Sequence, residues 1–208
     1  MVLLVSQFYQ IHPENPQLRL IHRAVEIIQK GGVVVFPTDS TYALGCHLSD
    51  RQAVERVRQI RQLSDKHHMT LVCRNLSELG VYARVEDNRA FRLIKSHTPG
   101  PYTFLLKATK EVPKRLSHPK RKSIGIRIPD NKILQTLLME LGEPLMSTSL
   151  ILPGEQEALM DPFEMRERLE HQVDLIVDGG YGGNEPTTMI DLFEGDATIL
   201  REGLGSIE

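Results

Sequence analysis

The run from Gly31 to Cys46 constrains the fold of this chain more than any other segment. It begins with Val33–Phe36, an apolar, β-branched stretch typical of a buried strand. Pro37 follows, and proline cannot extend a central ladder because it has no N–H to donate. Ligands in open α/β sheets bind where strands end. The small polar residues that come next therefore form either the rim of a ligand site or an ordinary turn: Thr38, Asp39, Ser40 and Thr41.

Hydrophobic periodicity predicts helices and strands along the rest of the chain. Apolar residues recur at helical spacing from Leu18 to Ile28, and Gly31 and Gly32 end that helix. Asp130 is the predicted N-cap of a later helix, which Gly142 ends. Further helices are predicted over 50–61, 88–95 and from 161, and a short helical turn is predicted to start at 77–78. Strands are predicted over 69–73, 102–107, 123–127, 145–149, 175–178, 188–192 and 198–201. Some strands are joined by helices and others by short loops, which predicts an α/β fold with a mixed, twisted sheet.

Length and composition indicate one ordinary globular domain. The chain has 208 residues, of which 40% are hydrophobic and 25% charged. No apolar run approaches the roughly 20 residues that span a bilayer, and the apolar N-terminus is too short for a signal peptide. The two cysteines, Cys46 and Cys73, make neither a disulfide framework nor a zinc pattern. These features predict a reduced, cytoplasmic protein that does not contact membranes.

The charge is unevenly distributed, although the net charge is only −2. Residues 107–127 carry eight basic side chains and a single acidic one, whereas residues 155–170 carry six acidic side chains and two arginines. The basic stretch is either an electrostatic footprint for a polyanion or a solvated loop. If it binds RNA, five residues form the expected contact patch: Lys114, Arg115, Lys120, Arg121 and Lys122.

Common nucleotide and metal motifs are absent from the sequence. There is no Gly-x-x-x-x-Gly-Lys-Ser/Thr loop, and no Gly-x-Gly-x-x-Gly follows a strand. The eight histidines show no metal-ligand spacing, so we predict no metal site and expect them on the polar surface.

Three arginines are candidates for a site. Arg61 closes a predicted helix, while Arg127 and Arg201 lie within predicted apolar strands. An arginine there is costly unless it is paired or faces a ligand. Each strand arginine is therefore either part of a structural ion pair, with Asp39, Asp178 or Asp191, or a ligand contact.

Six short motifs resemble, in order, the signatures of the YrdC/YciO family. The first is the predicted strand followed by Pro-Thr-Asp-Ser at residues 37–40. The others are Pro99–Thr103, Gly125–Pro129, Ser147–Ser149, Pro186–Asp191 and Leu200–Gly203. The resemblance covers residues 14–205 and leaves 1–13 as a short N-terminal extension. It implies a single domain with one twisted, open sheet, flanked by helices, whose concave face is basic.

Characterised members of that family make threonylcarbamoyl-adenylate from L-threonine, bicarbonate and ATP, with Mg²⁺ carried by the phosphates. The product is used to modify tRNA. The resemblance implies that the threonine and bicarbonate end is lined by Thr38, Ser40, Tyr42 and Thr103. It implies that the nucleotide is faced by Arg61, Arg127, Ser147, Ser149, Thr188 and Arg201, with Arg61 and Ser147 the best catalytic candidates. No tightly bound cofactor is expected.

Two motifs depart from the family pattern. The family's Lys-x-Arg is Gln59-Ile60-Arg61 here, and its Ser-x-Asn is Ser147-Thr148-Ser149. Lys66 is a nearby cation that could replace the lost lysine. Three hypotheses follow: a threonylcarbamoyl-adenylate synthase of reduced or altered activity, a paralogue that binds double-stranded RNA such as tRNA or rRNA without synthase activity, and a nucleotide sensor that binds without turnover.

Overall fold

The structure is a computed structural model that describes residues 5–64 and 66–207. Six helices lie in the described residues: α1 (Leu18–Gln29), α2 (Arg51–Arg61), α3 (Leu76–Tyr82), α4 (Asn88–Ser96), α5 (Lys132–Leu141) and α6 (Pro162–Leu169). Eleven strands lie there as well: β1 (Gln7–Gln10), β2 (Val34–Phe36), β3 (Ala43–His47), β4 (Thr70–Val72), β5 (Ala83–Arg84), β6 (Tyr102–Ala108), β7 (Ser123–Arg127), β8 (Leu145–Ser149), β9 (Leu175–Asp178), β10 (Thr188–Asp191) and β11 (Thr198–Arg201).

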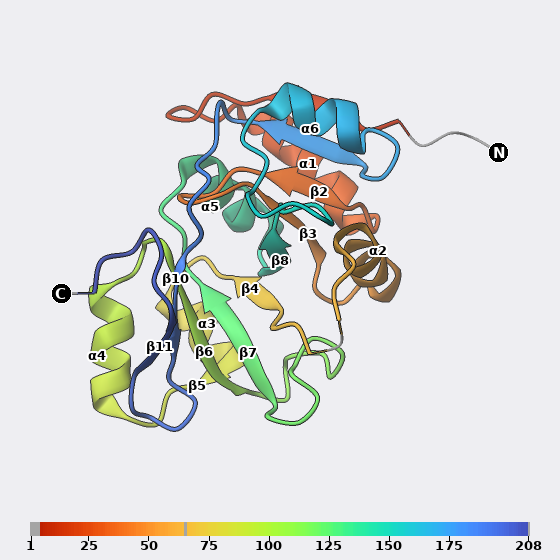
Figure 1. The fold of residues 1–208 in the computed structure, drawn as a ribbon. Coiled ribbons are helices and arrows are strands. Elements are labelled where there is room, and N and C mark those ends of the chain that lie inside the picture. The colour runs from red at the N-terminus through yellow and green to blue at the C-terminus, as the bar shows by residue number, and fades with distance from the viewer. Residues whose placement is uncertain (1–4, 65, 208) are drawn as a thin grey trace.

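The strands form a single mixed sheet, as the sequence predicts (Figure 1). Its order is β1-β9-β2-β3-β8-β4-β7-β6-β10-β11, and β5 pairs with β6. The pairs β1–β9, β9–β2, β4–β7 and β6–β10 are parallel, and the remaining pairs are antiparallel. Such a sheet brings together strand ends that lie far apart in the sequence.

Alternation along the strands divides the core between the two faces of the sheet. On one face, Val34 and Phe36 pack in a cluster with Ile28 of α1 and Leu138 of α5. On the other face, Val35 packs with Val57 of α2. The second cluster also includes buried residues of α4 and α6, such as Ile94 and Met165. The sheet is therefore flanked by helices on both sides.

The polar segment after β2 is the turn of a hairpin. Strand β3 returns antiparallel to β2, with Phe36 opposite Ala43 and Val34 opposite Gly45. Gly45 has no room for a side chain, because a Cβ there would lie 2.4 Å from the carbonyl oxygen of Met146. The hairpin consequently places residues 37–42 at one end of the sheet, next to the start of the β9–β10 connection.

Several local features differ from the sequence-based expectations, among them the two-residue strand β5, which was not predicted. Asn131, not Asp130, caps α5, since its side chain accepts a hydrogen bond from the backbone N–H of Leu134. Strand β3 was not predicted. Residues 7–10 of the predicted N-terminal extension form β1, which pairs with β9 at the edge of the sheet.

No helix in the part of the chain that the structure describes combines the length and the apolar character needed to cross a membrane. The cysteines Cys46 and Cys73 are free and buried.

Candidate functional site

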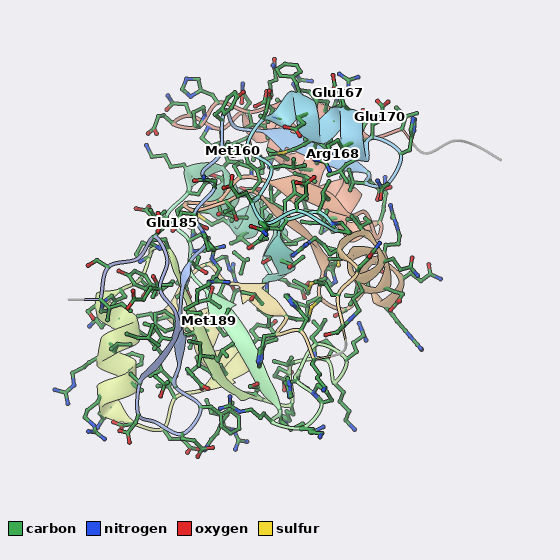
Figure 2. All side chains as sticks on the ribbon, in the orientation of Figure 1. Met160, Glu167, Arg168, Glu170, Glu185 and Met189 are labelled. Atoms are coloured by element: carbon green, nitrogen blue, oxygen red, sulfur yellow. The ribbon has the colours of Figure 1, made fainter. Side chains whose placement is uncertain are left out.

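A cavity of about 370 Å³ lies where the C-terminal end of α2 meets the middle of the sheet. It is lined from β4, β6, β7, β8, β10 and β11, and Figure 2 shows one of its lining residues, Met189, on β10. Four cationic side chains line it: Arg61, Lys66, Arg127 and Arg201. The lining hydroxyls include Thr103, Ser147, Ser149 and Thr187. No carboxylate is among the described residues that line it, so the cavity is suited to an anion.

Arg127 links the cavity to the turn after β2. Its Nη2 atom donates to Asp39 Oδ1 at 2.7 Å, to Ser40 Oγ at 3.1 Å and to Thr38 Oγ1 at 3.4 Å. Both members of the Arg127–Asp39 ion pair are buried. Burial lowers the pKa of Arg127, and the attraction of Asp39 opposes that shift. Of the two roles considered from the sequence, the structure confirms the ion pair with Asp39, and Arg127 also lines the cavity.

The turn is held rigidly around Arg127. Thr38 Oγ1 accepts from the Ser40 N–H at 3.1 Å and donates to the Thr41 carbonyl at 2.5 Å. Asp39 Oδ2 accepts from the Asp130 N–H at 2.9 Å. Thr38 and Ser40 therefore hydrogen-bond to Arg127, which lines the cavity, but neither of them is among the described residues that line it.

Arg61 and Arg201 have no carboxylate partner among the described residues. Arg201 donates to the Thr187 carbonyl from Nε at 3.0 Å and from Nη2 at 2.8 Å, both bonds to a neutral acceptor. Arg61 ends α2, and its Nε is enclosed without any hydrogen-bond partner, as is the Nε of Arg127. Burial lowers the pKa of Arg61 and of Arg201. Unpaired, partly buried guanidinium groups are costly unless an anion binds beside them.

Two residues carried over from the resemblance lie beside the cavity but are not among the described residues that line it. The buried Tyr42 hydroxyl donates to the Gly180 carbonyl at 2.7 Å and accepts from the Gly179 N–H at 3.0 Å. The Thr188 hydroxyl donates to the Gly205 carbonyl at 2.6 Å and accepts from the Gly203 N–H at 3.0 Å. The two hydroxyls therefore hold the backbone at residues 179–180 and 203–205 by hydrogen bonds.

Thr187, which directly precedes β10, provides a hydroxyl that lines the cavity, and this hydroxyl lies 2.7 Å from that of Thr103. Sequence reasoning missed it because the side chain that faces the site at the start of β10 depends on the register of that strand with β6.

The loop after α2 contributes Lys66, His67 and His68 to the cavity. The two histidines were expected on the polar surface and are instead half-buried in the wall. Gln59, which replaces the family lysine, lies with Arg56 and Gln172 at a separate surface depression. The adjacent His-His pair in a loop next to Arg61 was the available signal for this part of the site.

The basic patch is only partly free to bind a ligand. Arg115 donates to the carbonyls of Leu48 and Ser49, and Arg121 pairs with Asp191 at 2.7 Å. Lys114, Lys120 and Lys122 are exposed. The acidic segment lies mainly on α6, whose labelled side chains are at the opposite end of the molecule from the loop between β6 and β7 (Figures 1 and 2).

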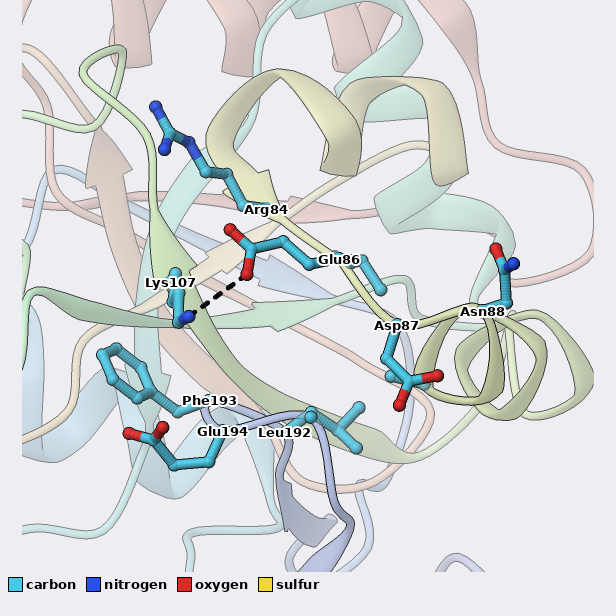
Figure 3. Close-up of a pocket in the computed structure, with 11 residues that line it drawn as sticks. Arg84, Glu86, Asp87, Asn88, Lys107, Leu192, Phe193 and Glu194 are labelled. Atoms are coloured by element: carbon cyan, nitrogen blue, oxygen red, sulfur yellow. Dashed lines mark hydrogen bonds and ion pairs between the residues drawn. The ribbon is translucent and has the colours of Figure 1, made fainter.

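A second cavity, of about 440 Å³, lies between the N-terminal end of α4 and the turn that joins β10 to β11 (Figure 3). It is lined by basic and acidic side chains together, and Lys107 pairs with Glu86 across 3.3 Å. None of the site residues predicted from the sequence lies there.

A family model matches residues 26–203, and its description reads "Telomere recombination" for the domain shared by Sua5, YciO and YrdC. The chain belongs to the Sua5/YciO/YrdC family. This membership agrees with the order of the motifs and with the open, mixed sheet.

Relatives and solved structures agree with the family. The chain is 59% identical over 204 residues to YciO of Escherichia coli, covering 98% of both proteins, and the crystal structure of that protein superposes with a TM-score of 0.94. It is 32% identical over 180 residues to a threonylcarbamoyl-AMP synthase of Pseudoalteromonas translucida, covering 84% of this chain and 94% of the synthase. The P. abyssi Sua5 structure in complex with L-threonine is 25% identical, with a TM-score of 0.87, and the match covers 95% of this chain and 58% of Sua5.

Proposed function

We propose that the cavity binds ATP with its Mg²⁺ together with L-threonine and bicarbonate, and that the protein forms threonylcarbamoyl-AMP and pyrophosphate. The observation that carries the proposal is the set of four cations in a cavity without a carboxylate among its described lining residues. Fixed cations of this kind stabilise a triphosphate and the charge that develops on its leaving group.

The proposed reaction needs orientation and charge stabilisation more than proton transfer. The amine of L-threonine captures bicarbonate as a carbamate with loss of water. A carbamate oxygen then attacks the α-phosphorus of ATP, the bond from that phosphorus to the bridging oxygen breaks, and pyrophosphate leaves with the electron pair. Arg61, Arg127 and Arg201 are the groups suited to hold the phosphates. The hydroxyls of Thr103, Thr187 and Ser147 are suited to orient the carbamate.

Two relatives support this assignment of substrates. One is named threonylcarbamoyl-AMP synthase, and the Sua5 structure is a complex with L-threonine. Magnesium enters as part of the substrate in this proposal, and the described residues contain no cluster of His, Cys, Asp or Glu that could hold a metal ion.

The test is pyrophosphate release by the purified protein with ATP, Mg²⁺ and bicarbonate, with L-threonine, with L-valine, or with neither. L-valine is the matched control because it keeps the shape of threonine but lacks the hydroxyl. We expect release that depends on L-threonine. Binding of MgATP without release under any of the three conditions would contradict the synthase and identify a nucleotide sensor.

A Gln59→Lys/Ser149→Asn double variant, which restores both family motifs, belongs beside the wild type. Release by both proteins supports the synthase. Release by the double variant alone would show that the native protein is not a synthase although its site is retained.

A second candidate function is binding of structured RNA, and the position of the basic loop favours it. His118 of that loop stacks on His68 in the cavity wall, with ring centroids 5.0 Å apart, so the exposed Lys114, Lys120 and Lys122 lie on a loop that borders the cavity. Few aromatic side chains are available to stack on bases, which favours recognition through shape and phosphates.

Salt-dependent binding of a double-stranded RNA tests this second function. Replacing the three lysines by Gln is expected to reduce the slope of log affinity against log salt by about 2–3, since each phosphate contact contributes a little under one unit. The triple variant Arg19→Gln/Arg23→Gln/Lys30→Gln, at three exposed positions on and at the end of α1, provides a charge-matched control. Affinity that does not depend on salt, or no affinity, would contradict RNA binding.

A further inference from the structure

His67 and His68 line the cation-rich cavity without making side-chain hydrogen bonds to any described residue. Both lie on the short loop between α2 and β4, and both rings are half-buried. Every other nitrogen-bearing side chain in the lining is a permanent cation at neutral pH. The two imidazoles are therefore the groups in this wall whose charge can change in the physiological range.

The surroundings of His68 determine which of its nitrogens carries a proton. Its Nδ1 is enclosed by protein and has no hydrogen-bond partner. A buried N–H without an acceptor is disfavoured more strongly than an unpartnered lone pair. We assign the neutral tautomer with the proton on Nε2, and protonation of both nitrogens is disfavoured. Burial, His118 and Arg121 lower the pKa of His68, and Asp191 opposes them.

His67 is held uncharged by a different cause. It has no enclosed, unpartnered nitrogen, but it lies among the cations Arg61 and Arg58 of α2 and Arg201 of β11, with His68 beside it. Burial and these four neighbours lower the pKa of His67 to about 4. None of these neighbours is a carboxylate. An anion placed among the same arginines reverses the sign of the local potential.

We propose that His67 is a further ligand-binding residue of this cavity, uncharged in the free protein and charged when a polyphosphate binds beside it. The proton comes from solvent, and His68 remains a neutral donor through Nε2. This inference rests on the proposed binding of a nucleoside triphosphate but does not require turnover.

The consequence is that acid strengthens ligand binding. Between the pKa of His67 in the free protein, about 4, and its higher pKa in the complex, binding takes up one proton. Affinity therefore rises about tenfold for each unit by which the pH falls within that window. Permanent cations alone would give no such dependence.

Histidine Cε1–H resonances, followed by NMR through a pH titration with and without saturating MgATP, test the proposal. His67→Gln and His68→Gln assign the two signals, and the exposed His22, which pairs with Glu140 outside the cavity, is the internal control. We expect the pKa of His67 to rise by about two units or more on binding and that of His68 to stay below its ordinary value. A pKa of His67 that MgATP does not move, or that is already ordinary in the free protein, overturns the inference and leaves the proposed function standing. MgATP that does not bind at any pH overturns both.

Calorimetry provides a second measurement that does not depend on signal assignment. The ratio of MgATP affinities at about pH 5 and about pH 7 is expected to be roughly tenfold or more larger for the wild type than for His67→Gln, a comparison that cancels the titration of the nucleotide itself. Equal ratios for the two proteins contradict the proposal.

Discussion

The cavity beside α4 and the cavity at the end of α2 differ in how the charges that line them are balanced. In the cavity beside α4, Lys107 pairs with Glu86 (Figure 3) and lies 5.6 Å from the centre of the Phe193 ring. Asp87 of this cavity pairs with Arg89. In the cavity at the end of α2, Arg61 and Arg201 have no carboxylate partner among the described residues. The first cavity is slightly larger, yet acidic and basic side chains line it together, and Lys107, Glu86 and Asp87 are each in an ion pair within the protein.

Cationic side chains without a carboxylate partner are therefore stronger support for an anion-binding site than the size of a cavity. Burying two guanidinium groups without a counter-ion costs stability, and a sequence tolerates that cost where a ligand supplies the missing charge. The Arg127–Asp39 pair lies between these two situations, because it is balanced internally but still faces the cation-rich cavity.

The largest expected effect is on the balanced pair. Replacing Arg127 by Met leaves Asp39 buried without its partner, and breaking a buried pair in this way costs about 3–5 kcal/mol of unfolding free energy. Urea denaturation measures the loss. The Asp39→Asn/Arg127→Met variant is expected to recover much of it, and a single Arg127→Met variant as stable as the wild type would contradict the account.

The second prediction compares the two cavities directly. Arg61→Met is expected to weaken MgATP binding by roughly a hundredfold, as expected for the loss of a strong charge-assisted hydrogen bond. Its folding stability should be unchanged or higher, because Arg61 Nε is enclosed without a partner. Lys107→Met is the matched control in the cavity beside α4 and should change MgATP affinity less than about threefold. Equal effects in the titration calorimeter would remove the distinction between the cavities.

The third prediction concerns the substitution of the family lysine. Lys66 lines the cavity and is exposed, so Lys66→Gln should weaken MgATP binding by about fivefold. Gln59 lies at a separate depression, so Gln59→Lys alone should change little. A large gain in affinity from Gln59→Lys would show that a side chain at position 59 reaches the ligand, which would contradict this prediction.

The smallest expected effect is on the Arg121–Asp191 pair. Burial raises the pKa of Asp191, but hydrogen bonds from Arg121 and from the Phe193 N–H outweigh it, and the net pKa is lowered. A lowered carboxyl pKa stabilises the fold above the pKa of the unfolded chain, near 4, and this stabilisation is lost as the pH falls through the folded-state value. Arg121→Gln should therefore cost about 1 kcal/mol or less at neutral pH. Urea denaturation at several pH values should show this difference narrowing below about pH 4, and a constant difference would contradict the assignment.

Local signals predicted most of the fold. The helical spacing from Leu18 to Ile28 and the β-branched run at Val33–Phe36 are visible in short windows of sequence, and both elements formed as expected. Strand β1 was missed because its partner β9 lies some 168 residues away, and nothing in Gln7–Gln10 itself indicates that pairing. Strand β3 was missed because Ala43–His47 contains no β-branched residue and includes a glycine, so its local β-propensity is weak.

The types of residue in the candidate site were predictable from the sequence, but which side chains face the cavity was not. Sequence reasoning identified Arg61, Arg127 and Arg201 as candidates, and the structure brings all three to one cavity. The sequence analysis assigned Thr188 to the site, but Thr187 is the residue that lines the cavity. Strand register determines which of two adjacent residues faces a cavity, and this register cannot be seen in the sequence. The sequence analysis expected His67 and His68 at the polar surface, since burial of a loop depends on the elements packed around it.

A crystal structure of the protein with Mg²⁺ and a non-hydrolysable ATP analogue tests the central claim most directly. The account predicts phosphate density among Arg61, Arg127 and Arg201, in the cavity at the end of α2. Phosphate density beside Lys107 and Phe193, in the cavity with balanced charges, would contradict it.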